Sequence, residues 1–118
     1  MTDDRLEDSN NWELLLWLLG FRFRFRVKGL SMAPLLKPGD ELLVDPNAYR
    51  QKLPFPGDIV VAKHPYRSDL LLVKRVASVL KDGNCFLIGN NSSESTDSRS
   101  FGSVSPEHII GRVCCRFP

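Results

Sequence analysis

The chain has 118 residues, a length that suits one compact domain and excludes several independently folding ones. With 42% hydrophobic and 25% charged residues, it has the composition of a folded globular protein. The net charge of +2 is unevenly spread, because residues 1–20 hold five acids and one arginine (−4), which leaves +6 on residues 21–118. This balance is milder than that of a nucleic-acid binder, so nucleic acid is not expected as a partner.

Cysteine and histidine patterns argue against two further kinds of site. Cys85, Cys114 and Cys115 form no CxxC pair and leave an odd number, so no disulfide framework is expected. Neither His64 nor His108 has a second ligand at metal-binding spacing, and each is expected at the surface or at a strand end. We therefore expect no metal and no cofactor.

The first 20 residues are expected to form an acidic tail, frayed over residues 1–9, and one short apolar helix. Asn10 with Glu13 three residues later is typical of a helix start, and Gly20 ends the apolar run. That run is too short to cross a bilayer, and an acidic beginning differs from a secretory signal, so we expect a cytoplasmic location. The helix is expected to pack on the body; the alternative is that Trp12–Phe21 docks on a membrane surface or a partner.

Residues 21–118 are expected to form a single β domain. Phe21, Phe23, Phe25 and Val27 alternate with Arg22, Arg24, Arg26 and Lys28, which predicts a half-buried strand with a basic face. That face is either solvated or available to an acidic partner. Two Pro-Gly-Asp turns, at 38–40 and 56–58, each start a strand, and more strands are expected within 70–80, 85–88 and 109–115. The pattern predicts a mainly β, small barrel or sandwich with one short N-terminal helix.

Ser31 stands at a junction that can support chemistry. The preceding strand stops at Gly29, and Pro34 fixes the chain three residues after the serine, so a hydroxyl and several backbone N–H groups can be exposed together. A serine hydroxyl is a poor nucleophile at neutral pH and needs a base. On this segment alone, a serine that merely completes a turn is the competing interpretation.

Lys74 is the candidate base because it interrupts an apolar strand. It shares a strand face with Leu70, Leu72 and Val76, and apolar surroundings disfavour the charged ammonium and lower its pKa. The opposite face is almost as apolar, so the pattern leaves open which face is inside. A lysine that extends to solvent is the alternative.

The segment 89–102 is rich in Ser, Asn and Asp and has no strand pattern. Asp97 and Arg99 can form a salt bridge within it, and its hydroxyls can hydrogen-bond a lysine amine. The alternative is a flexible surface loop.

Taken in order, these segments resemble the signal peptidase I family of serine–lysine proteases. The matching motifs are Gly29-x-Ser31-Met32-x-Pro34, Lys37-x-Gly39-Asp40, Lys74-Arg75-Val76, and Gly89-x-Asn91 with Ser95-x-Asp97-Ser98-Arg99-x-x-Gly102. They cover about residues 25–116. The resemblance implies the fold of that family's catalytic core, a protein substrate and hydrolysis of a peptide bond.

The resemblance also implies a role for each matching residue. Ser31 would be the nucleophile and Lys74 the general base, with the Ser31 N–H stabilising the oxyanion. Gly29 stands where some members carry a second, hydroxyl donor. Ser95 would orient the lysine, and the ion pair of Asp97 and Arg99 would support that serine's loop. Met32 and Pro34 would shape the substrate pocket.

Three departures from the family pattern bear on these roles. The family's Gly-Asp-Asn is here Gly89-Asn90-Asn91, which removes a carboxylate near the site. A Pro-Gly-Asp soon after the lysine motif is absent. The membrane anchor and extra β domain of typical members are not expected in a chain of this length.

Among small members, the chain is most similar to the maturation proteases of nickel superoxide dismutase, through the loop 90–102 and the Gly111-Arg112-Val113 ending. That similarity implies removal of a short leader from the dismutase precursor, with nickel belonging to the substrate. Alternatives are a membrane-surface signal peptidase, a self-cleaving regulator of the LexA type, and a non-catalytic β-barrel binding module. The LexA type is disfavoured by the Asp97-Ser98-Arg99 loop and by the lack of length for a DNA-binding domain.

Overall fold

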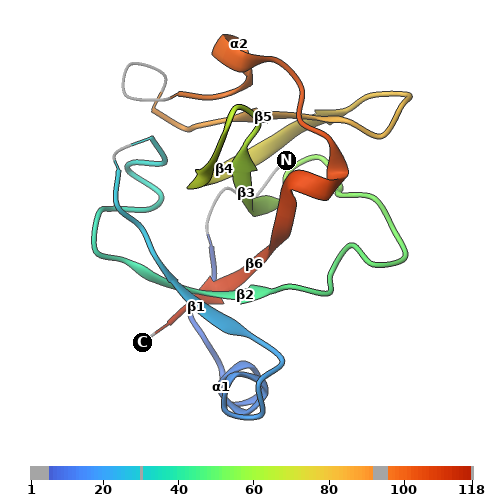
Figure 1. Ribbon diagram of the computed structural model, residues 1–118. Coiled ribbons are helices and arrows are strands. Elements are labelled where there is room, and N and C mark those ends of the chain that lie inside the picture. The colour runs from blue at the N-terminus through green and yellow to red at the C-terminus, as the bar shows by residue number, and fades with distance from the viewer. Residues whose placement is uncertain (1–5, 30, 92–95, 118) are drawn as a thin grey trace.

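The structure is a computed structural model that describes residues 6–29, 31–91 and 96–117 (Figure 1). Its elements in chain order are α1 (Asn11–Leu18), β1 (Phe23–Arg26), β2 (Glu41–Asp45), β3 (Ile59–His64), β4 (Arg67–Val79), β5 (Cys85–Ile88), α2 (Ser98–Phe101), a 3-10 helix at Pro106–His108, and β6 (Ile109–Arg116). The expected mainly β architecture with a short N-terminal helix is confirmed.

The strands form one antiparallel sheet in the order β1-β2-β6-β3-β4-β5. Strand β6 therefore joins the β1–β2 pair to the β3–β4–β5 group, and Figure 1 shows it running between the two. The first strand is shorter than the alternation suggested, because only Phe23–Arg26 pairs with β2 in register. Sequence-distant segments are thereby brought side by side around β6.

Two clusters of buried side chains pack against the sheet, and both include residues of β3 and β4. The first includes Val27, Val61, Val73 and two residues of the turn after β1, Met32 and Leu36. Met32 is 1% exposed and Leu36 is fully buried, and burying such a side chain is worth about 1.5–3 kcal/mol. The turn that contains Ser31 is thus anchored in the core. The second cluster consists of Val60, Ala62, Val76, Cys85, Leu87 and Val104.

The segment before α1 is ordered against the last strand, so the expected fraying is wrong for residues 6–9. The Ser9 N–H donates to the Arg116 carbonyl at 2.8 Å, and the Arg116 N–H donates to the Glu7 carbonyl at 2.9 Å. The Arg116 guanidinium also donates to the carbonyls of Leu6 (2.6 Å) and Leu35 (2.5 Å). The end of β6 offers open backbone groups, and these residues pair with them.

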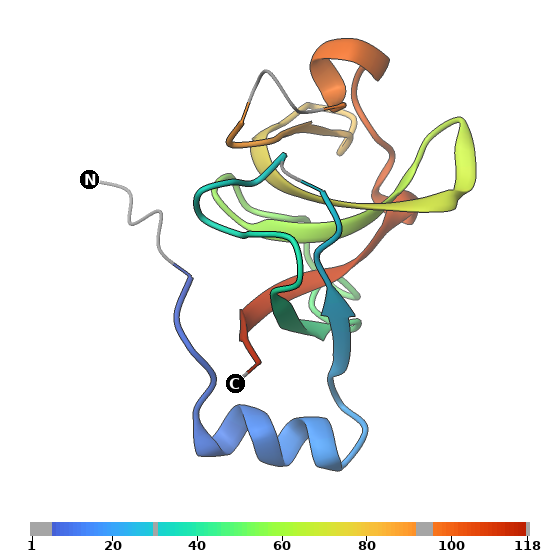
Figure 2. The same cartoon turned by 90° about the vertical axis from the view of Figure 1, so that its left-hand side faces the viewer.

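Helix α1 begins where expected, since the Asn10 side chain accepts a hydrogen bond from the Glu13 N–H at 2.8 Å. Its contact with the body is partial: Trp17 packs edge-on against Phe117 at 4.8 Å, but no residue of the helix is buried. Figure 2 shows α1 lying beneath the rest of the molecule. Large apolar side chains remain exposed on and beside it, namely Trp12, Leu15, Leu18, Leu19 and Phe21. Within the described ranges, none of the helices reaches the length and hydrophobicity of a membrane span.

The basic row along β1 is partly neutralised within the molecule. Arg22 pairs with Glu13 at 2.9 Å, while Arg24 and Arg26 both pair with Glu41. One carboxylate thus serves two arginines whose side chains are 40% and 67% exposed, so part of the row's charge stays at the surface.

Candidate active site

The turn that carries Ser31 is closed by backbone hydrogen bonds at its two ends. The Val27 N–H donates to the Asp40 carbonyl and the Gly39 N–H donates to the Val27 carbonyl, both at 2.8 Å. Inside the turn, the Leu36 N–H donates to the Met32 carbonyl at 2.9 Å. The Lys37-Pro38-Gly39-Asp40 motif thus closes the loop that begins just before Ser31.

Lys74 lies in the middle of β4, opposite Val60 of β3. Only 2% of the residue is exposed, so the alternative of a lysine extending to solvent is wrong. Burial lowers the pKa of the Lys74 amine from its usual value; the nearby carboxylate of Asp97 opposes this shift and the guanidinium of Arg99 adds to it. The arrangement favours the neutral amine that a general base requires.

Ser31 and Lys74 line the same cleft, which has two parts. The first, called here the apolar lobe, has a volume of about 300 Å³ and is lined by Phe25, Val27, Lys28, Gly29, Ser31, Met32, Leu70, Leu71, Leu72, Val73 and Lys74. The second, the polar lobe, has a volume of about 260 Å³ and is lined by Gly29, Ser31, His64, Arg67, Leu70, Leu72, Lys74 and Thr96. The two lobes share Ser31 and Lys74, so the serine and the lysine stand where the lobes meet.

The loop that follows β5 is organised by the carboxylate of Asp97, which is 1% exposed. Asp97 accepts hydrogen bonds from the N–H groups of Gly89 (2.9 Å) and Arg99 (3.0 Å) and caps α2. It also forms the ion pair with Arg99 that the sequence suggested, at 2.5 Å. One buried carboxylate therefore ties the end of β5 to the start of α2 and lies close enough to Lys74 to influence its pKa.

A backbone hydrogen bond connects this loop to the serine. The Asn91 N–H donates to the Ser31 carbonyl at 2.7 Å. Asn90 is exposed, and its side chain accepts a long hydrogen bond from the Arg75 side chain, at 3.4 Å. The contact to Ser31 comes from the backbone of Asn91, so it needs no carboxylate at position 90. Ser95, the residue expected to orient the lysine, lies outside the described residues.

Gly29 and Pro34 occupy different surroundings. Gly29 lines both lobes, and a Cβ added there would meet no atom within 4 Å, so a side chain with a hydroxyl has room. Pro34 is exposed, forms a cis peptide with Ala33, and is not among the described residues that line either lobe. Met32 does line the apolar lobe and is at the same time part of the core.

His64 is a cleft residue that sequence reasoning missed. It lies at the end of β3 as expected for a strand end, but it is only 9% exposed and its ring packs on Phe101 at 4.8 Å. It lines the polar lobe together with Arg67, the first residue of β4. No group of three or more His, Cys, Asp or Glu side chains suited to a metal occurs in the part of the chain that the structure describes.

Comparison with known proteins decides the family. Residues 14–80 and 77–117 match the family described as signal peptidase, peptidase S26. The chain belongs to this family. It is a family of serine proteases, and the two matched ranges cover the turn with Ser31, the strand with Lys74 and the loop with Asp97.

Three relatives illustrate the similarity. Mitochondrial inner membrane protease subunit 1 of Xenopus tropicalis is 34% identical over 107 residues, which cover 75% of this chain and 64% of the relative. Mitochondrial ATP-independent inner membrane protease subunit 1b of Arabidopsis thaliana is 34% identical over 110 residues, covering 75% and 65%. Signal peptidase I V of Bacillus subtilis (strain 168) is 29% identical over 137 residues, covering 75% and 82%. The chain spans less than two thirds of the length of these two mitochondrial relatives.

Proposed function

We propose that this protein is a serine endopeptidase that removes an N-terminal leader from a precursor protein, with Ser31 as nucleophile and Lys74 as general base. The observation that carries the proposal is the meeting of Ser31 with a buried lysine, whose pKa is lowered by burial, in one cleft. A neutral amine beside a hydroxyl is the minimum that serine catalysis requires.

The proposed reaction proceeds in two stages. In the first, the Lys74 amine takes the proton of the Ser31 hydroxyl as the oxygen attacks the scissile carbonyl. The backbone N–H of Ser31 is a donor for the oxyanion, and such a donor is worth about 3–4 kcal/mol. The tetrahedral intermediate collapses to an ester, and the lysine ammonium protonates the leaving amine. In the second stage Lys74 removes a proton from water as the water attacks the ester, and the resulting ammonium returns a proton to the Ser31 oxygen as the acyl group leaves.

The sheet offers a place for an extended peptide beside these residues. Strand β5 pairs only with residues between Arg75 and Val79 of β4, whereas β3 pairs along β4 from Arg67 to Arg75. Among the described residues, the stretch Leu71–Val73 therefore has a strand partner on one side only. That stretch lines the apolar lobe, so a peptide added along it would pass Ser31.

The proposal is tested by single replacements at the two residues. Ser31→Ala and Lys74→Met should each leave a folded protein that no longer cleaves the precursor. Two matched controls change exposed residues of the same types. They are Ser78→Ala, at a serine of β4, and Lys63→Met, at a lysine of β3. Cleavage by Ser31→Ala at the wild-type rate would contradict the mechanism.

For the substrate, we propose the precursor of nickel superoxide dismutase, on the strength of the resemblance in loop 90–102 and in the Gly111-Arg112-Val113 ending. The relatives named above provide no support for this substrate. Incubation with the dismutase precursor, followed by mass analysis of the new N-terminus, tests it. An intact precursor, under conditions in which another leader peptide is cleaved, would eliminate this substrate and leave the Ser31/Lys74 mechanism in place.

A second candidate is a signal peptidase that acts at a membrane surface, and the exposed apolar side chains of α1 and Phe21 favour it. The cytoplasmic location expected from the sequence gains no support from relatives whose names place them at the mitochondrial inner membrane. Co-sedimentation with anionic vesicles distinguishes the two locations. Leu15→Glu with Leu19→Glu should abolish binding, whereas Leu80→Glu, an exposed leucine remote from α1 in sequence, should not. Absence of binding by the wild-type chain would eliminate this candidate.

A further inference from the structure

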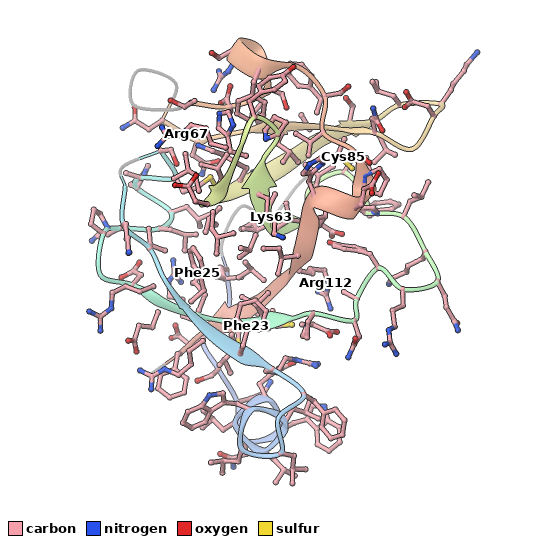
Figure 3. All side chains as sticks on the ribbon, in the orientation of Figure 1. Phe23, Phe25, Lys63, Arg67, Cys85 and Arg112 are labelled. Atoms are coloured by element: carbon pink, nitrogen blue, oxygen red, sulfur yellow. The ribbon has the colours of Figure 1, made fainter. Side chains whose placement is uncertain are left out.

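The polar lobe contains a cation that the proposed reaction does not use. The pair His64–Arg67 lies next to the pair Lys63–Leu71 in the β3–β4 ladder, so residues 68–70 of β4 have no counterpart on β3. Such a bulge changes the direction in which neighbouring side chains point. It brings Arg67 to the cleft, where it lines the polar lobe with Ser31 and Lys74. In Figure 3, Arg67 lies on the side of the turn after β1, whereas Lys63 lies closer to β6.

The charge of Arg67 is not balanced within the described part of the molecule. Arg22, Arg24, Arg26 and Arg99 each pair with a carboxylate. In contrast, no residue in the described ranges forms an ion pair or hydrogen bond with the Arg67 guanidinium. A guanidinium presents several N–H donors in a planar fork that matches a carboxylate.

His64 supplies a second donor next to Arg67. Its Nδ1 accepts a hydrogen bond from the Tyr66 N–H at 3.1 Å, so in the neutral ring the proton is on Nε2. Packing against Phe101 and burial fix the ring in this orientation. The imidazole therefore presents a donor, and not an acceptor, at its remaining nitrogen.

We propose that His64 and Arg67 form a subsite that binds a carboxylate side chain of the substrate, an Asp or Glu close to the scissile bond. The inference rests on the proposed function, because it places the peptide across Ser31. An extended chain advances about 3.3 Å per residue, and the polar lobe borders Ser31 itself, so the acidic residue lies within about two positions of the cleaved bond. The subsite is specific for charge, whereas the apolar lobe, which shares Ser31 with the polar lobe, accepts uncharged side chains.

The experiment uses a peptide library prepared from a proteome with a lysine-specific protease, and mass spectrometry identifies each bond that the full chain cleaves. The wild type should cleave bonds with Asp or Glu enriched at one position by about fivefold over Asn or Gln, as suits a partly exposed ion pair. Arg67→Gln should remove the enrichment while other cleavage continues. Arg67→Glu should replace it with enrichment of Arg at the same position, because the library retains internal arginines.

The matched control is Lys63→Gln, an exposed cation of the same hairpin that does not line the polar lobe, and it should cleave like the wild type. Ser31→Ala shows which cleavage depends on the proposed nucleophile, so the subsite and the proposed function can fail separately. If Ser31-dependent cleavage occurs without acidic enrichment, or if Arg67→Gln retains the enrichment, the subsite is wrong and the proposed function stands. If no bond is cleaved in a Ser31-dependent manner, both are overturned.

Discussion

Replacing Asp97 with alanine should lower the free energy of unfolding by about 3 kcal/mol. The carboxylate caps α2 through the Arg99 N–H, and loss of a helix cap costs about 1 kcal/mol. It also accepts the hydrogen bond of the buried Gly89 N–H, and a buried donor left without a partner costs about 1–3 kcal/mol. The ion pair adds little, because the Arg99 side chain is 45% exposed and solvent screens the attraction.

Urea unfolding followed by circular dichroism measures this change directly. For a chain of this size, 3 kcal/mol corresponds to a melting temperature lower by about 12 °C. Asp69→Ala, at an exposed aspartate of β4, is the control and should change the unfolding free energy by less than about 0.5 kcal/mol. A loss below about 1 kcal/mol in the Asp97 variant would refute the view that this carboxylate organises the loop.

Three other perturbations concern the lysine and a close backbone contact. Asp97 raises the pKa of Lys74 and Arg99 lowers it. Asp97→Asn should therefore shift the acid limb of the kcat/KM–pH profile to lower pH, and Arg99→Gln should shift it to higher pH. Shifts of both variants in the same direction would contradict this. Lys74→Met should abolish cleavage yet raise the unfolding free energy in urea by about 1 kcal/mol, because a buried amine is replaced by an apolar chain. Gly111→Ala should lower it by about 2 kcal/mol, because the new Cβ would lie 2.5 Å from the Asp45 carbonyl oxygen; unchanged stability would exclude that contact.

The strands could be predicted because their signal is local. Alternation and Pro-Gly-Asp turns depend on neighbouring residues, and they placed β2, β3, β5 and β6 close to their observed bounds. The buried face of β4 could not be predicted. Val73 belongs to the first cluster and Val76 to the second, so apolar residues pack on both faces of the strand and the pattern around Lys74 is ambiguous.

The proposed subsite residues, His64 and Arg67, escaped prediction for a different reason. Strict alternation along β4 says nothing of a bulge, and it is the bulge at residues 68–70 that brings Arg67 to the lobe lined by His64. The ordering of residues 6–9 likewise depends on the end of β6, more than a hundred residues away. Contacts of this kind are set by tertiary structure, which the local pattern does not contain.

The central position of β6 has a consequence for how the protein matures. The serine follows β1 and the lysine lies on β4, and in the sheet the β1–β2 pair meets the β3–β4–β5 group only through β6. During synthesis both halves leave the ribosome before the strand that connects them. Pairings so distant in sequence form slowly, since a long loop must close before they gain stability. In a nascent chain the two groups of the proposed dyad should therefore stay apart, and the cleft that they share should form only when the last described strand docks.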